Sequence, residues 1–225
     1  MKSKERIGVL LLGYNNQELN NEMVLKGTPA QPGRLIRFAD VILRHNTVIA
    51  VISGGMGVKD GIGEAEWARR MLYQAIPELK NFTSYHIFGE LSPEQIKEVF
   101  DRVLVLEDKA KNTAENLLNT GAMFDKASID ELVVVTSLDH VSRGYKEAIL
   151  HWEKAYPNLV LHLSVTNSFN YYSARPGDEA IAKIENVVIA EPPVMKIFNL
   201  ARMFRILKNP EALAEIDAVL KKNGA

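Results

Sequence analysis

The sequence predicts an α/β fold in which helices cover both faces of a mainly parallel β-sheet, giving three layers. Short, unbroken apolar runs alternate along the chain with segments of helical periodicity, a pattern typical of βαβ units. The runs are rich in β-branched residues and have no alternating polar face, as expected for strands that are buried on both sides. Polar clusters follow several of these runs directly. Because the carboxyl ends of parallel strands meet at one edge of a sheet, we expect these clusters to lie together.

The composition is that of an ordinary globular chain. Of 225 residues, 47% are hydrophobic and 24% are charged, so we interpret 1–225 as a single domain with its core over about 7–190. The net charge of −1 gives no electrostatic reason to expect a nucleic-acid partner. The sequence contains no cysteine, which excludes disulfides, thiolate catalysis and cysteine-based zinc sites. This suits a reducing compartment, and we expect a cytoplasmic location.

The first apolar run, Ile7–Leu12, is interpreted as a strand and not as the core of a signal peptide. It ends at Gly13 and polar residues follow, whereas a signal peptide would have a longer apolar core and a small-residue cleavage site. No apolar run elsewhere approaches the roughly 20 residues that span a bilayer. We therefore expect no membrane association.

A polar segment, 14–32, separates this strand from a predicted helix at 33–44. The segment is either a loop that covers a ligand or a surface excursion. Arg34 and Arg37 lie three residues apart in the first turn of the helix, so they share a face. They would either bind an anion or be solvated.

The second predicted strand, 48–52, runs into Ser53-Gly54-Gly55-Met56-Gly57. A glycine-rich turn lets the backbone approach a ligand and point N–H groups at a phosphate or carboxylate. The pattern is neither a Walker loop nor G-x-G-x-x-G. In the helix predicted at 64–74, Glu64 and Glu66 suit the helix dipole without any function. Glu64 is the better candidate for chemistry because it is nearer to the glycine turn.

A third strand, 103–106, is preceded by a helix that starts at Ser92-Pro93-Glu94-Gln95. Glu107 follows the strand directly, and we find no structural explanation for a carboxylate at this position. Asn112 and Glu115 have one, because their spacing predicts a capping box at the start of the next helix.

The fourth strand, 132–135, is followed by Thr136 and Ser137 and by a helix predicted at 139–155. His140 and Arg143 would share a face in its first turn, beside the positive end of the helix dipole. This arrangement attracts anions, although both side chains could equally be surface residues of a helix start. A fifth strand is predicted at 159–165 and a last one at 187–189. Helices within 193–223 are expected to pack on the sheet, with a homo-oligomer contact as the alternative.

In this order the motifs resemble the YdcF-like family, which is related to SanA and ElyC, over about residues 7–165. The matching positions are Gly13; Arg34 and Arg37; Ser53-Gly54-Gly55; Glu64-Ala65; Glu107; Asn112-Thr113-Ala114-Glu115-Asn116; Val135-Thr136-Ser137; and His140 with Arg143. Ala110 stands where the family often has serine and Gly144 where it often has alanine. Tyr14-Asn15-Asn16 replaces the usual small residues after the first strand.

The resemblance implies a Rossmann-like domain with a polar pocket lined by the matching residues. The pocket would include Gly13, Asn112, Thr113, Asn116, Thr136 and Ser137. The family's activity is largely undefined, and nucleotide-like ligands, S-adenosylmethionine among them, have been suggested for it. The start of this chain does not match the membrane helix of the SanA and ElyC branches, so we do not expect their role at the cell envelope.

Two functions fit these residues. In the first, the chain is an enzyme that acts on a small anionic, phosphorylated or nucleotide-like substrate. Its anion would be held by Arg34, Arg37 and Arg143, with the Ser53–Gly55 amides and Ser137. Proton transfer would fall to Glu64, Glu107 and His140. In the second, the same pocket belongs to a sensor or regulator without chemistry.

A protein metal site is not expected, because His140 has no second histidine at ligand spacing. Mg²⁺ would be held only through a phosphate of the ligand, with help from carboxylates and Asn112.

Overall fold

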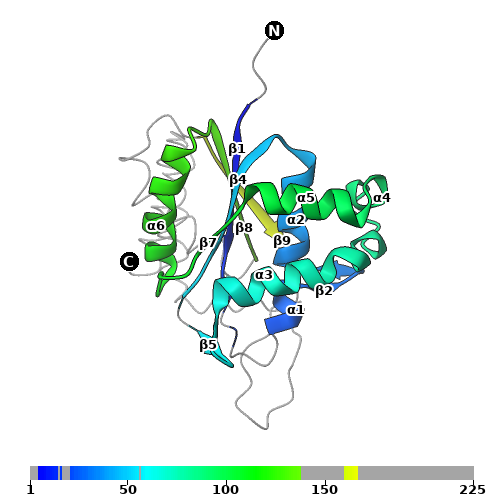
Figure 1. Cartoon of the computed structure of the whole chain (residues 1–225), viewed down its shortest axis with the longest axis horizontal. Coiled ribbons are helices and arrows are strands. Elements are labelled where there is room, and N and C mark those ends of the chain that lie inside the picture. The colour runs from blue at the N-terminus through cyan, green and yellow to red at the C-terminus, as the bar shows by residue number, and fades with distance from the viewer. Residues whose placement is uncertain (1–4, 15, 17–20, 56, 138–159, 167–225) are drawn as a thin grey trace, which may run out of the picture. The chain divides into compact units, whose positions relative to one another are not determined.

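The computed structural model describes residues 5–14, 16, 21–55, 57–137 and 160–166. All of them belong to the first of two compact units into which the chain divides, Met1–Glu185 and Asn186–Ala225. Five described strands form one parallel sheet (Figure 1). They are β1 (Ile7–Leu12), β4 (Thr47–Ser53), β7 (Leu104–Glu107), β8 (Glu131–Ser137) and β9 (Val160–Thr166). The predicted Rossmann-like α/β fold is therefore confirmed.

The strand order across the sheet is β7-β4-β1-β8-β9. From β1, the strands β4 and β7 are added in turn on one side. The chain then crosses back over the sheet, and β8 and β9 are added on the other side of β1. The order therefore reverses between β1 and β8. In open α/β sheets, ligands bind at such a reversal, beyond the carboxyl ends of the strands.

Helices cover both faces of this sheet (Figure 1). α2 (Arg34–Arg44), α3 (Glu64–Ala75) and α5 (Pro93–Val103) lie on one face, and α6 (Thr113–Lys126) lies on the other. Connections between parallel strands are right-handed, so the successive crossovers from β1 to β4 and from β4 to β7 place their helices on the same face. The crossover from β7 to β8 runs the other way, and α6 consequently lies on the opposite face.

The burial of β1 explains why its sequence is apolar without alternation. Val9 and Leu11 pack into the hydrophobic cluster under α2, α3 and α5. Leu10 and Leu12 pack into the cluster under α6. All four side chains are fully buried. A strand that contributes to two cores in this way cannot carry a polar face.

The predicted elements within the described residues are found with small shifts. The helix at 33–44 is α2, with Gly33 as its N-cap, and the helix at 64–74 is α3. The strand predicted at 103–106 begins one residue later, because α5 extends through Val103. The strand predicted at 132–135 is longer, since β8 includes Thr136 and Ser137. The strand predicted at 159–165 is β9.

Several short elements were not predicted. They are α1 (Asn21–Leu25), β2 (Gly27–Thr28), β3 (Gln31–Pro32), β5 (Val58–Lys59), β6 (Ile62–Gly63), the 3-10 helix η1 (Ile76–Asn81) and α4 (Ile87–Glu90). The helix expected at 139–155, the strand at 187–189 and the helices at 193–223 lie outside the described residues. Among the helices that the structure describes, none combines the length and apolar character needed to cross a membrane.

Candidate functional site

Four neighbouring strands end at one polar edge of the sheet. Gly13 follows β1, and Ser53, Glu107 and Ser137 are the last residues of β4, β7 and β8. Strand pairing aligns Ser53 with Leu12 on one side and with Glu107 on the other. The clusters predicted to lie together at the strand ends therefore do so, as far as the described residues reach. The buried polar side chains in and around this edge are Arg34, Ser53, Glu64, Glu107, Asn116, Thr136 and Ser137.

Arg34 reaches this edge from the first turn of α2, and its side chain is only 1% exposed. Its Nη1 donates to the carbonyl oxygens of Leu12 and Gly13 at 3.2 and 3.1 Å. Its Nε and Nη2 donate to Ser137 Oγ at 3.0 and 2.5 Å. The guanidinium thus connects the end of β1 to the end of β8, where the strand order reverses. The alternative that Arg34 is a solvated surface residue is wrong.

Tyr14 supports Arg34 from the loop after β1. The Cζ atom of Arg34 lies 5.2 Å from the centroid of the Tyr14 ring, a distance at which the ring quadrupole attracts a cation. The aromatic ring and the hydrogen bonds together hold the guanidinium in one place. Tyr14 was not among the predicted site residues.

The glycine turn after β4 packs tightly against the turn after β7. Gly54 N donates to Glu107 O at 2.9 Å, and Gly55 N donates to Ala110 O at 2.8 Å. A Cβ atom on Gly55 would lie 2.2 Å from Asp108 O. The expectation that the Gly54 and Gly55 amides point at an anion is therefore wrong, because main-chain carbonyls already accept from both. These glycines are needed for close packing of the two turns.

Glu64 lies against the same turn, as expected from its position in the sequence. It is the first residue of α3 and is 8% exposed. A Cβ atom on Gly54 would lie 2.7 Å from Glu64 Oε2, so the glycine makes room for the carboxylate. Ala65 N also donates to Gly54 O at 3.1 Å, which joins the start of α3 to the turn. A carboxylate is thereby held at the end of β4, beside the end of β1.

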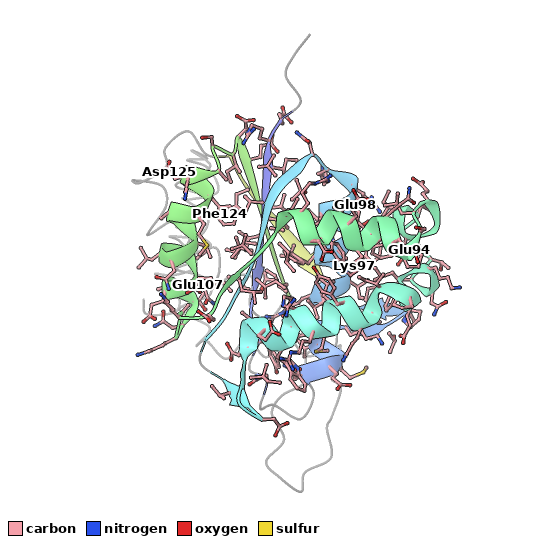
Figure 2. All side chains as sticks on the ribbon, viewed as in Figure 1. Glu94, Lys97, Glu98, Glu107, Phe124 and Asp125 are labelled. Carbon is pink, nitrogen blue, oxygen red and sulfur yellow. The ribbon has the colours of Figure 1, made fainter. Side chains whose placement is uncertain are left out.

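Glu107 has a structural explanation that we did not expect from the sequence. Its Oε1 accepts from Lys109 N, Ala110 N and Asn119 Nδ2 at 3.0, 3.1 and 2.9 Å, and its Oε2 accepts from Ser53 Oγ at 2.6 Å. The carboxylate closes the turn after β7 and fastens this turn to α6. Figure 2 shows Glu107 beside α6. These four contacts give Glu107 a structural role that is independent of proton transfer.

Ser53 links Glu107 to α6 and is fully buried. Its Oγ lies 2.6 Å from Glu107 Oε2 and 3.0 Å from Asn116 Oδ1. A hydroxyl has one proton, and an ionised carboxylate can only accept, so the Ser53 proton belongs to Glu107. The contact with Asn116 is then satisfied when the amide is turned so that Nδ2 donates to Ser53 Oγ. Ser53, Glu107 and Asn116 form one closed network.

Asn112 acts as the N-cap of α6, as its spacing to Glu115 predicted, but the capping box is incomplete, because the Glu115 side chain accepts from Lys111 N and Asn112 Nδ2 in place of Asn112 N. Its Oδ1 accepts from Glu115 N at 2.9 Å. The Glu115 carboxylate accepts from Asn112 Nδ2 and Lys111 N, both at 2.9 Å. Asn112 is exposed, whereas Thr113 is buried beside it in the first turn of the helix. These contacts give Asn112 a capping role that is independent of any ligand.

Arg37 is positioned by contacts with Asp40 and Tyr85, whereas Arg34 is positioned by the strand ends. Its Nη1 donates to Asp40 Oδ2 at 2.6 Å, and its guanidinium lies 5.8 Å from the centroid of the Tyr85 ring. Burial raises the pKa of Asp40 above its usual range, although Arg44 and Arg37 both act against this rise. These contacts explain Arg37 as part of an ion cluster on α2.

The structure thus brings Gly13, Arg34, Ser53, Glu64, Glu107, Asn116 and Ser137 to one region. Thr136 is fully buried one residue before the end of β8. His140 and Arg143 lie outside the described residues. Asn119 was missed, although its spacing of three from Asn116 would have placed both amides on one face of α6.

Among the described residues, no group of three or more histidine, aspartate or glutamate side chains is arranged to hold a metal ion. Neither the protein-family models nor the curated proteins include a match for this chain.

Proposed function

We propose that this protein is an enzyme that binds a small anionic, nucleotide-like or phosphorylated substrate at the carboxyl edge of its sheet. The observation that carries the proposal is the buried guanidinium of Arg34, which joins the ends of β1 and β8. The strand order reverses between these two strands, and ligands of open α/β sheets bind at such a reversal. A positive charge held there favours an anionic group of the ligand.

Glu64 is our candidate for proton transfer. It is a buried carboxylate at the end of β4, close to the strand ends that Arg34 connects. Glu107 is the second candidate, because its four protein donors give it a role in holding the turn after β7. His140 and Arg143 complete the proposed site on the strength of the sequence, and the resemblance to the YdcF-like family remains part of the proposal. S-adenosylmethionine is one candidate ligand, and Mg²⁺ would enter only with a phosphate.

The alternative is a sensor or regulator that binds such a ligand without changing it. This alternative is favoured by the closed network of Ser53, Glu107 and Asn116 and by the engaged amides of Gly54 and Gly55. Ser53, Glu107, Asn116 and the two glycine amides are satisfied within the fold, so their contacts make the site rigid. The absence of cysteine supports a cytoplasmic location in either case.

The proposal is tested by a ligand screen followed by a matched pair of variants. Nucleotides, sugar phosphates and S-adenosylmethionine are screened by thermal shift, and compounds that bind are then incubated with the protein and followed for product. Glu64→Gln keeps the size of the side chain and removes its charge. Glu66→Gln, in the same turn of α3, is the control, because the Glu66 carboxylate is bound by Arg69 and Arg70.

If the enzyme proposal is correct, Glu64→Gln binds the substrate about as well as the wild type does and converts it about a hundred-fold more slowly or worse. The Glu66→Gln variant keeps its turnover. If the wild type binds tightly and forms no product, the sensor alternative replaces the enzyme. If no compound binds, the site is not a small-anion site.

A further inference from the structure

Asn16 is a buried polar residue in the loop that follows β1. Its side chain is fully buried, which is unusual for asparagine outside regular structure. Its Nδ2 donates to the main-chain oxygen of Ile62 at 2.9 Å. A carbonyl oxygen can only accept, so this hydrogen bond fixes which end of the Asn16 amide faces Ile62.

The other end of the amide is unsatisfied. Within the described part of the chain, Asn16 Oδ1 is buried and has no hydrogen-bond partner. Turning the amide over would not help, because two acceptors would then face each other at Ile62. A buried acceptor without a donor is costly, and such a group in a native structure calls for an explanation, such as a functional role or a bound water or ion.

The position of Asn16 connects this acceptor to the proposed site. Ile62 belongs to β6. It is followed by Gly63, which is the N-cap of α3, and then by Glu64. Glu64 lies against Gly54, and Gly13, at the start of the Asn16 loop, donates to Ser53 O at 2.8 Å. A hydrogen bond therefore joins Asn16 to the segment that leads into Glu64, and Glu64 lies against the turn after β4. The cation of Arg34 lies on the β8 side of β1.

We propose that Asn16 Oδ1 accepts a hydrogen bond from an O–H or N–H group of the ligand and so determines which anions the site selects. The inference rests on the proposed function and narrows it. The ligand would carry its negative charge toward Arg34 and a hydroxyl or amino group toward Asn16 and Glu64. A ribose hydroxyl or a base amine of a nucleotide meets this requirement, and so does the hydroxyl of a sugar phosphate. A bare inorganic anion does not.

The test compares donor-bearing probes with a donor-free anion on the full chain. The binding of adenosine monophosphate, glucose 6-phosphate and S-adenosylmethionine is measured by calorimetry, and sulfate serves as the donor-free probe. Asn16→Ala removes the acceptor. Asn46→Ala is the matched control, because Asn46 also donates from Nδ2 to a main-chain oxygen, that of Glu5, but near the amino end of the sheet.

We expect Asn16→Ala to weaken the best donor-bearing probe about five- to ten-fold and to leave the affinity for sulfate unchanged. Asn46→Ala should change neither affinity. A second measurement on the wild type covers the case in which Asn16→Ala fails to fold. The NMR resonances of the Asn16 side-chain amide should shift with the donor-bearing probe and not with sulfate.

Three outcomes would overturn the inference. If a donor-bearing probe binds and Asn16→Ala leaves its affinity unchanged, Asn16 is not a contact, while the proposed function stands. If the affinities for this probe and for sulfate fall equally, Asn16 only supports the loop. If the wild type binds none of the probes, the proposed function fails and this inference fails with it.

Discussion

Glu64 and Glu66 show how two carboxylates in one helical turn come to differ. Residues two apart on a helix do not face the same way. The Glu66 carboxylate accepts from Arg69 Nε and Arg70 Nε at 2.7 and 2.8 Å, which lowers its pKa to about 2, chiefly through the hydrogen bonds from Arg69. Glu64 instead turns inward against Gly54. The chemistry available to each carboxylate follows from where its side chain points.

Glu66→Gln should lower the free energy of unfolding at pH 7 by about 1 kcal/mol. The effect is modest because its two arginine partners are partly exposed and screened by solvent. The folded pKa lies below the unfolded value of 4.5, so this stabilisation is present above pH 4.5 and is lost as the pH falls toward 2. Urea unfolding of the wild type and the variant at pH 7, 4 and 2.5 measures the difference.

Glu98→Gln is the control for this series, since Glu98 is exposed on α5 (Figure 2). Its effect on stability should stay within about 0.5 kcal/mol at each pH. A difference between Glu66→Gln and the wild type that is as large at pH 2.5 as at pH 7 would show that the charge of Glu66 is not its cause.

At the level of elements, the turn after β4 is defined by contact with the turn after β7. The backbone of Gly55 approaches the oxygens of Asp108 and Ala110 too closely for any side chain. Gly55 does not have a positive φ, so it is required for space and not for backbone conformation. The same contact orients Glu107, whose carboxylate receives the amides of its own turn.

Gly55→Ala should therefore destabilise the protein by about 2 kcal/mol or more, as overpacking against backbone atoms does. Gly89→Ala is the matched control, because a Cβ on Gly89 in α4 would meet nothing within 4 Å. That change should be neutral or stabilising, since alanine favours a helix over glycine. Urea unfolding measures both. Equal stability of the two variants would mean that the turn after β7 moves aside at little cost.

At the level of the whole described sheet, Arg34 ties together parts that are distant in the sequence. It belongs to α2, and its guanidinium lies over the Tyr14 ring. The same group donates to the last residues of β1 and β8. The strand order places β1 and β8 side by side, and their carboxyl ends leave carbonyl groups that need donors. The Arg34 guanidinium, which belongs to a helix, donates hydrogen bonds to such carbonyl groups.

Arg34→Ala should lower the free energy of unfolding by about 2–4 kcal/mol, because it leaves buried carbonyl groups and Ser137 without their donors. Arg102→Ala, at an exposed position on α5, should change it by less than about 0.5 kcal/mol. Urea unfolding at neutral pH compares the two variants. If both have the stability of the wild type, Arg34 does not hold the strand ends together.

The features that the sequence predicted correctly are local ones. Apolar runs without alternation identified β1, β4 and β8, because a strand buried on both faces has no polar side. The spacing of Asn112 to Glu115 and of Ser92 to Gln95 predicted the starts of α6 and α5, since a cap involves residues of a single turn. The collection of polar groups at one edge also followed, because all parallel strands end there.

The roles of the individual polar groups were decided only by the tertiary structure. Ser53 and Glu107 are 54 positions apart, and Arg34 and Ser137 are 103 apart. Until the strand order was known, no pattern indicated that Glu107 would receive donors from its own turn, from β4 and from α6, or that the glycine amides would be engaged. Side-chain spacing reports which residues share a face of one element. Which donor meets which acceptor depends on the neighbours that the fold places beside that face.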